Sequence, residues 1–119
     1  MKIVISATGK NDTDLLDMRF GRCTYFQIHD TENKEVKIIE NKGQASSGGA
    51  GIVAAQQIID EKVDVIITGN LGPNAFEIIE KAGIKTYKCG NVTISSAIDK
   101  YKNGELEEIK IAGSAHHGM

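Results

Sequence analysis

Two cysteines and two arginines are the side chains of this sequence best suited to bind another molecule. Cys23 and Cys89 are far apart, and neither belongs to a Cys-x-x-Cys pair, so in a reducing compartment we expect free thiols. A lone thiol of this kind is more often a small packed residue than a reactive one. A nucleophilic thiol enzyme would need a histidine beside Cys23, and no loop at the same end of the expected fold supplies one.

Glycine-rich segments are the second chemical feature. The loop 41–51 contains Ser46-Ser47-Gly48-Gly49-Ala50-Gly51 directly before an expected helix. It lacks the Gly-Lys-Ser/Thr ending of a P-loop and the strand-to-turn context of a dinucleotide fingerprint. The segment is therefore only a weak indication of a nucleotide or phosphate site.

Hydrophobic periodicity predicts the elements that position these residues. We expect strands at 2–7, 24–30, 35–40, 63–68 and 84–87, and helices at 52–61, 73–83 and 93–104. Strands two and three form a hairpin, because turn residues separate them. Pro73 suits the first turn of its helix, and Gly83 suits the end.

This order predicts an α/β fold in which helices cover a mixed sheet. Right-handed crossovers and adjacency of consecutive strands favour five strands in the order 3-2-1-4-5, with strand 2 antiparallel. That is a ribonuclease-H-like, three-layer α/β/α arrangement. We expect a single domain over residues 1–112 and a flexible C-terminal tail over 113–119, which contains His116 and His117.

The predicted topology brings five loops to one end of the sheet, the rim at the carboxyl ends of the parallel strands. Such rims are the usual ligand sites of open α/β sheets. This one would hold both cysteines, both arginines and the amino ends of three helices, which favours a negatively charged ligand. Three strand spacings separate Cys23 from Cys89 by about 14 Å, too far for both to bind one zinc ion.

Composition narrows the classes of partner. The chain has 119 residues, 40% of them hydrophobic, and a net charge of −2 without a Lys/Arg block. We therefore expect no nucleic-acid binding. The amino-terminal apolar run is too short for a signal peptide, and no stretch reaches membrane-spanning length. The expected location is the cytoplasm, without membrane association.

Met18-Arg19-Phe20-Gly21-Arg22-Cys23-Thr24-Tyr25-Phe26 resembles a segment typical of the dinitrogenase iron-molybdenum cofactor biosynthesis family, whose members include nitrogenase accessory factors. Further similar segments follow in the same order at 48–52, 65–75 and 83–87, and the likeness covers nearly the whole chain. The resemblance implies the ribonuclease-H-like fold. It also implies a binding or carrier protein, rather than an enzyme, for an iron-sulfur-type or iron-molybdenum-type cluster, or a precursor, that is bound transiently and passed to a delivery partner.

In this interpretation Cys23, and with it Cys89, supplies thiolate to the metal, and the arginines meet the negative charge of the cluster. The implied cofactor-binding residues are Arg19, Gly21, Arg22, Cys23, Gly48, Gly49, Gly51, Asn70 and Gly72. Two alternatives stay open. One is a small anionic ligand such as a nucleotide or phosphate. The less favoured one is a nuclease or phosphotransferase, because only Asp12 and Asp14 lie in a suitable loop for its metal ions.

Overall fold

The strand β1 (Lys2–Ala7) is the centre of the sheet, and its apolar run is buried on both faces as the sequence predicts. A computed structural model describes residues 1–111 of the chain. β1 pairs antiparallel with β2 (Tyr25–Asp30), and β2 pairs antiparallel with β3 (Val36–Glu40). On its other side β1 pairs parallel with β4 (Val65–Thr68), which pairs parallel with β5 (Lys85–Lys88).

The sheet has six strands in the order β3-β2-β1-β4-β5-β6. The predicted order of the first five strands and the antiparallel direction of strand 2 are confirmed, but the number five is wrong. The additional strand is β6 (Glu107–Glu108), which pairs antiparallel with β5. Two residues are too few for a periodic pattern, so this strand gave no signal in the sequence.

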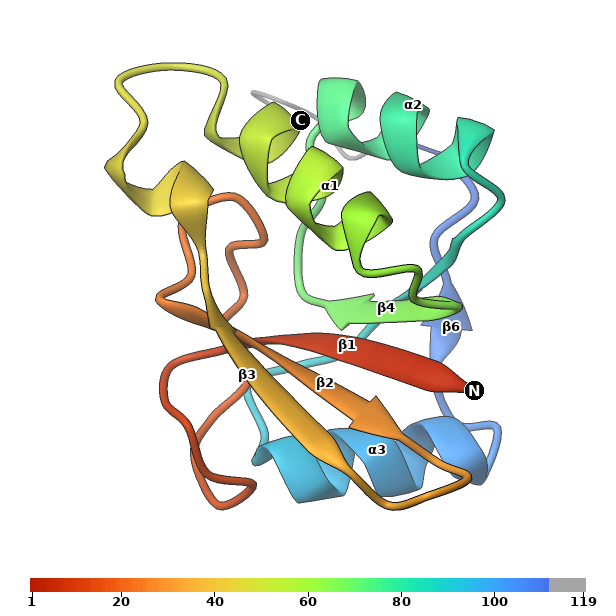
Figure 1. Ribbon diagram of the computed structural model, residues 1–119. Helices are drawn as coiled ribbons and strands as arrows, with labels where there is room; N and C mark the ends of the chain where they lie inside the picture. Colours follow the sequence, from red (N-terminus) through yellow and green to blue (C-terminus); the bar gives the residue numbers. More distant parts are fainter. Residues whose placement is uncertain (112–119) are drawn as a thin grey trace.

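Helices cover both faces of the sheet (Figure 1). On one face lie α1 (Ala50–Asp60) and α2 (Pro73–Lys81), which pack against each other. On the opposite face lies α3 (Ile94–Lys102). The α/β class and its three layers therefore agree with the prediction, and a closer ribonuclease-H-like relationship stays a prediction.

Alternation along the strands divides the core in two. Val4 and Ile66 face α1 and α2, whereas Ile3, Ile5 and Ile67 face α3. Each half of the core is a contiguous set of buried apolar side chains, so the helix layers are anchored independently.

Three expectations concern the chain end, the domain boundary and membrane-spanning segments. The expected tail 113–119, with His116 and His117, lies outside the described residues, as does the predicted domain boundary at residue 112. Within residues 1–111, no helix combines the length and the apolar character that crossing a membrane requires.

Candidate functional site

A shallow pocket walled by glycines lies where α1 and α2 begin. Its volume is about 180 Å³. The lining residues are Phe20, Gly21, Gly49, Gly51, Ile52, Gly72, Pro73, Asn74 and Ala75. We call this the glycine pocket. Four of the predicted cofactor-binding glycines thus line one pocket, although they come from three separate segments of the chain.

Close backbone approach explains why glycine stands at two of these positions. A Cβ atom on Gly21 would lie 2.9 Å from the Gly51 nitrogen and 3.0 Å from its Cα atom. A Cβ on Gly51 would in turn lie 3.4 Å from the Ala75 Cβ. The segment 19–23, the start of α1 and the start of α2 are therefore in direct contact, and a side chain at Gly21 would separate them.

The amino ends of α1 and α2 carry backbone donors that the described chain leaves unused. The N-cap residues, Gly49 and Gly72, provide no side-chain hydrogen bond. The first helical hydrogen bonds are donated by Val53 to Gly49 and by Phe76 to Gly72. Within residues 1–111, no acceptor is paired with the N–H groups that precede them in each helix. They are the N–H groups of Ala50, Gly51 and Ile52 in α1, and of Asn74 and Ala75 in α2.

Such donors, together with the positive ends of two helix dipoles, form a site suited to an anion. Gly49 adopts a left-handed conformation with φ 67°, which glycine tolerates best. Gly48 and Gly72 have open space where a Cβ would be. A ligand can therefore approach the backbone closely at Gly49 and Gly72, while Ile52, Pro73 and Asn74 contribute side chains to the lining.

The third helix does not contribute in the way the sequence predicts. The α3 N–H groups of Ile94 and Ser95 donate to the Asp14 and Asp12 carbonyl oxygens, at 2.9 and 3.0 Å. The Ser96 N–H donates to Thr93 Oγ1 at 3.2 Å. The expectation that three helix ends face a ligand is therefore corrected to two.

The arginines have different roles. Arg22 Nη1 donates to the Ser46 and Gln44 carbonyl oxygens, at 2.9 and 3.2 Å, and so holds the loop before α1. Arg19 forms a two-point ion pair with the buried carboxylate of Asp17, at 3.0 and 3.1 Å. The Arg19 side chain is 66% exposed, but much of its charge is balanced by Asp17.

Asn41 ties the glycine-bearing loops together. Its buried amide Nδ2 donates to the carbonyl oxygens of Gly21 and Cys23, at 3.1 and 2.9 Å, while Oδ1 accepts from the Gly43 N–H. The loop 41–51 contains the 3₁₀ turn η1 (Lys42–Ala45), which is capped at both ends, by the Asn41 side chain and by the Ser46 N–H, which donates to the Gly43 carbonyl oxygen. Asn at the start of a turn with Gly two residues later is the sequence signal that could have revealed this contact.

Cys23 lies beneath the pocket, in the core. Its side chain is fully buried, and Sγ donates to the Phe20 carbonyl oxygen at 3.4 Å. Burial raises the pKa of the Cys23 thiol to about 12, and the nearby charge of Asp17 acts in the same direction. A thiol that is sealed and neutral is poorly suited to bind metal, so this placement argues against the expected ligand role.

Cys89 is also buried, and burial raises the pKa of its thiol. It belongs to the core on the α3 side of the sheet, whereas Cys23 belongs to the core on the α1 and α2 side. The two thiols cannot act together on one ion, in agreement with the separation expected from the strand order. Among residues 1–111, no group of three or more His, Cys, Asp or Glu side chains is arranged to hold a metal ion.

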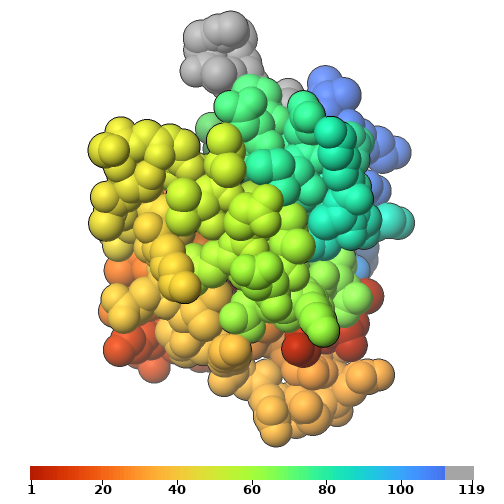
Figure 2. Space-filling model, turned by 45° about the horizontal axis from the view of Figure 1, so that its top comes forward, coloured from red at the N-terminus to blue at the C-terminus, as the bar shows by residue number. Residues whose placement is uncertain are grey.

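Four of the nine implied cofactor-binding residues, all glycines, line the pocket, so the structure offers backbone rather than thiolate donors there. Asn70 lies beside Arg19 through an isolated parallel bridge, at the edge of the same rim. Asp17 was missed in the sequence, since a single polar residue before a motif carries no distinctive spacing. Asn41 was missed as well, although its spacing to Gly43 indicates a turn. Figure 2 looks onto the face formed by segment 41–49, α1 and α2.

Sequence comparison decides the family. A profile described as dinitrogenase iron-molybdenum cofactor matches residues 1–104. The chain belongs to the dinitrogenase iron-molybdenum cofactor family. An uncharacterized protein of Methanocaldococcus jannaschii is 35% identical over 102 residues, covering 83% of this chain and 86% of that protein.

Solved structures are similar to this chain over nearly its whole length. The apo form of the orange protein from Desulfovibrio gigas has a TM-score of 0.90 at 30% identity and covers 95% of this chain and 96% of that one. A Thermotoga protein provisionally named NifB has a TM-score of 0.84 at 33% identity, covering 97% and 98%. The resemblance inferred from the Arg-Phe-Gly-Arg-Cys segment is thereby confirmed.

Proposed function

We propose that this chain is a carrier that binds an anionic metal-sulfur cluster, or a precursor of one, in the glycine pocket and releases it unchanged. The observation that carries the proposal is the pair of open helix ends, whose unused N–H groups at Gly51, Ile52, Asn74 and Ala75 belong to residues that line the glycine pocket. The cluster is cargo here, and the chain supplies binding rather than catalysis.

Thiolate ligation is not part of this proposal. The sulfur of Cys23 is sealed beneath Phe20, and Cys89 lies on the far side of the sheet. Backbone N–H groups can instead donate to the cluster sulfides, as they do to other anions at helix ends. Binding without metal–protein bonds would suit a carrier, because release then requires no bond to a metal to break.

Family membership and the neighbours support the same class of cargo. The family profile is named for the iron-molybdenum cofactor, and the orange protein structure is described as an apo form. A second candidate, a phosphate or nucleotide binder, uses the same donors, so the two functions must be separated by the choice of ligand.

The test compares variants of the N-cap of α2. Gly72 has an extended backbone and free space at Cβ, so Gly72→Asp should place its carboxylate on the N–H groups of α2. We expect anaerobic binding of isolated iron-molybdenum cofactor, followed by EPR and co-elution in gel filtration, to weaken by about 10-fold. Gly72→Ser separates the effect of capping from that of charge, because serine caps without adding charge.

Gly90→Asp is the matched control, since Gly90 also has free space at Cβ but lies in the loop between β5 and α3. It should leave binding unchanged. Equal weakening in both aspartate variants would indicate general charge repulsion and contradict the assignment. Saturation of the wild type by inorganic phosphate, with displacement of the cofactor, would favour the anion-binding alternative.

Two cysteine variants complete the design. Cys23→Ala and Cys89→Ala should both retain the cofactor. Loss of binding in a folded Cys23→Ala protein would restore the thiolate interpretation and contradict binding by backbone donors alone.

A further inference from the structure

Among residues 1–111, no strand pairs with the outer edge of β6, and its side chains alternate in charge and polarity. β6 is the last strand of the sheet, and its inner side pairs with β5 in the register Tyr87↔Glu108. The pairing continues past β6, because the Ile109 N–H donates to the Thr86 carbonyl oxygen at 2.7 Å. Unpaired N–H and C=O groups at such an edge are a template for another strand.

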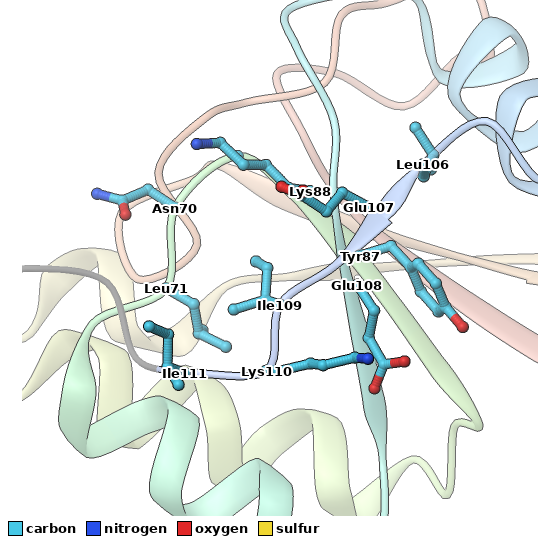
Figure 3. A pocket seen from close by; sticks show the side chains of 11 residues that line it. Asn70, Leu71, Tyr87, Lys88, Leu106, Glu107, Glu108, Ile109, Lys110 and Ile111 are labelled. Atoms are coloured by element: carbon cyan, nitrogen blue, oxygen red, sulfur yellow. The ribbon is translucent and has the colours of Figure 1, made fainter.

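The side chains alternate between the two faces of this edge. Glu108 and Lys110 lie on the side of Tyr87, whereas Ile109 and Ile111 lie on the opposite side, near Leu71 (Figure 3). Ile111 is 80% exposed, the largest exposed fraction of any large hydrophobic side chain among residues 1–111. Lys110 and Glu108 make no ion pair within that part of the chain.

Backbone direction limits how a second strand can add. Because Ile109 points its N–H group inward to β5, Glu108 and Lys110 point theirs outward. A two-fold axis perpendicular to the sheet can therefore pair Glu108 with Glu108, Lys110 with Lys110, or Glu108 with Lys110 of a second copy. The first two registers place like charges opposite each other, which is unfavourable.

We propose that two copies of this chain associate through antiparallel pairing of their β6 edges, in the register that places Glu108 of each copy opposite Lys110 of the other. This register also places Ile109 against Ile109 on the two-fold axis, beside the exposed side chain of Ile111. The two six-stranded sheets become one continuous sheet. The proposal is independent of the carrier function, and residues 105–111 lie beyond the part of the chain matched by the family profile.

The surface is small, so the complex is weak, with a dissociation constant on the order of 100 µM. Sedimentation equilibrium of the full chain up to about 1 mM should detect the dimer. Glu108→Lys and Lys110→Glu should each weaken it by about 10-fold, because each replaces two opposite-charge pairs with two like-charge pairs. The double variant Glu108→Lys/Lys110→Glu should regain wild-type association, since the charges are then exchanged rather than removed.

Lys102→Glu, which makes the same change of charge on α3, is the control and should leave the dimer intact. A wild-type monomer at the highest concentration overturns the proposal. If removal of residues 112–119 then produced a dimer, the occupant of this edge in the full chain would be its own end, and the two-fold pairing would again be wrong. Equal association of both single variants with the wild type, or failure of the double variant to regain it, overturns the register.

Discussion

The α1 and α2 side of the sheet and the α3 side begin their helices in opposite ways at the same rim. Thr93 caps α3, and carbonyl groups of the loop 8–15 take its first N–H groups. Glycine stands at the N-cap of both α1 and α2, and no side chain caps either helix. The first N–H groups of α3 are therefore paired with acceptors inside the protein. Those of α1 and α2 have no such acceptor among residues 1–111 and are available to a ligand. Position on the rim does not by itself make a helix end a binding site; the absence of an internal acceptor does.

The largest effect on the open side is expected from a variant that separates the starts of α1 and α2. In Gly21→Ala the new Cβ would press on the backbone of Gly51, and overpacking of this kind costs about 3 kcal/mol. Urea unfolding should report this loss, together with loss of cofactor binding. Gly48→Ala is the control, because no atom lies within 4 Å of its Cβ position. Equal stability of the two variants would show that the close approach is not needed.

A second test uses the thiol beneath the open side. The folded protein holds Cys23 neutral, because burial raises its pKa from 9.0 to about 12. Its contribution to stability is complete below the pKa of the unfolded chain and is lost as the pH rises toward the folded value. The free energy of unfolding should therefore fall by about 1.4 kcal/mol per pH unit in this range.

The difference between wild type and Cys23→Ala isolates this effect from other alkaline titrations, because the variant lacks only this thiol. Unfolding in urea between pH 9 and 12 measures it. Parallel pH profiles for the two proteins would show that Cys23 ionises normally and is accessible, which would reopen its ligand role.

A smaller effect is expected on the closed side. Thr93→Ala removes the cap of α3 and should lower stability by about 1 kcal/mol, measured by thermal unfolding. Binding of the cofactor should be unchanged, because the α3 end carries no ligand in the proposed site. A change in binding without a change in stability would contradict the contrast between the two sides.

The smallest effect concerns the loop that leads into α1. Arg22→Ala removes two hydrogen bonds to the Gln44 and Ser46 carbonyl groups. Because these bonds are exposed, we expect a loss of only about 0.5 to 1 kcal/mol and faster amide exchange across residues 44–48. Arg22→Lys should recover part of the protection. Unchanged exchange would mean that Asn41 alone holds this loop.

The sequence predicted the fold well because its strands are buried runs with clear alternation. Strand order, the hairpin and the three helices followed from periodicity and connection rules, whereas the two-residue strand β6 had no pattern to detect. In the site, the grouping of glycines was predictable from topology. The burial of Cys23 was not, since a cysteine after a charged motif is compatible with either a surface or a core position. The capping of α3 was visible in Thr93, but its carbonyl partners at Asp12 and Asp14 are distant in sequence.

The amide of Asn41 has a consequence for how the protein could be altered. Because one side chain fixes the end of β3 to Gly21 and Cys23, the pocket wall does not depend on the length of the turn at Ser47. Ser47 and its neighbours Gly48 and Gly49 are exposed. Extra residues inserted there, such as a short epitope or a fluorescent reporter peptide, would extend into solvent beside the cargo while leaving the wall in register.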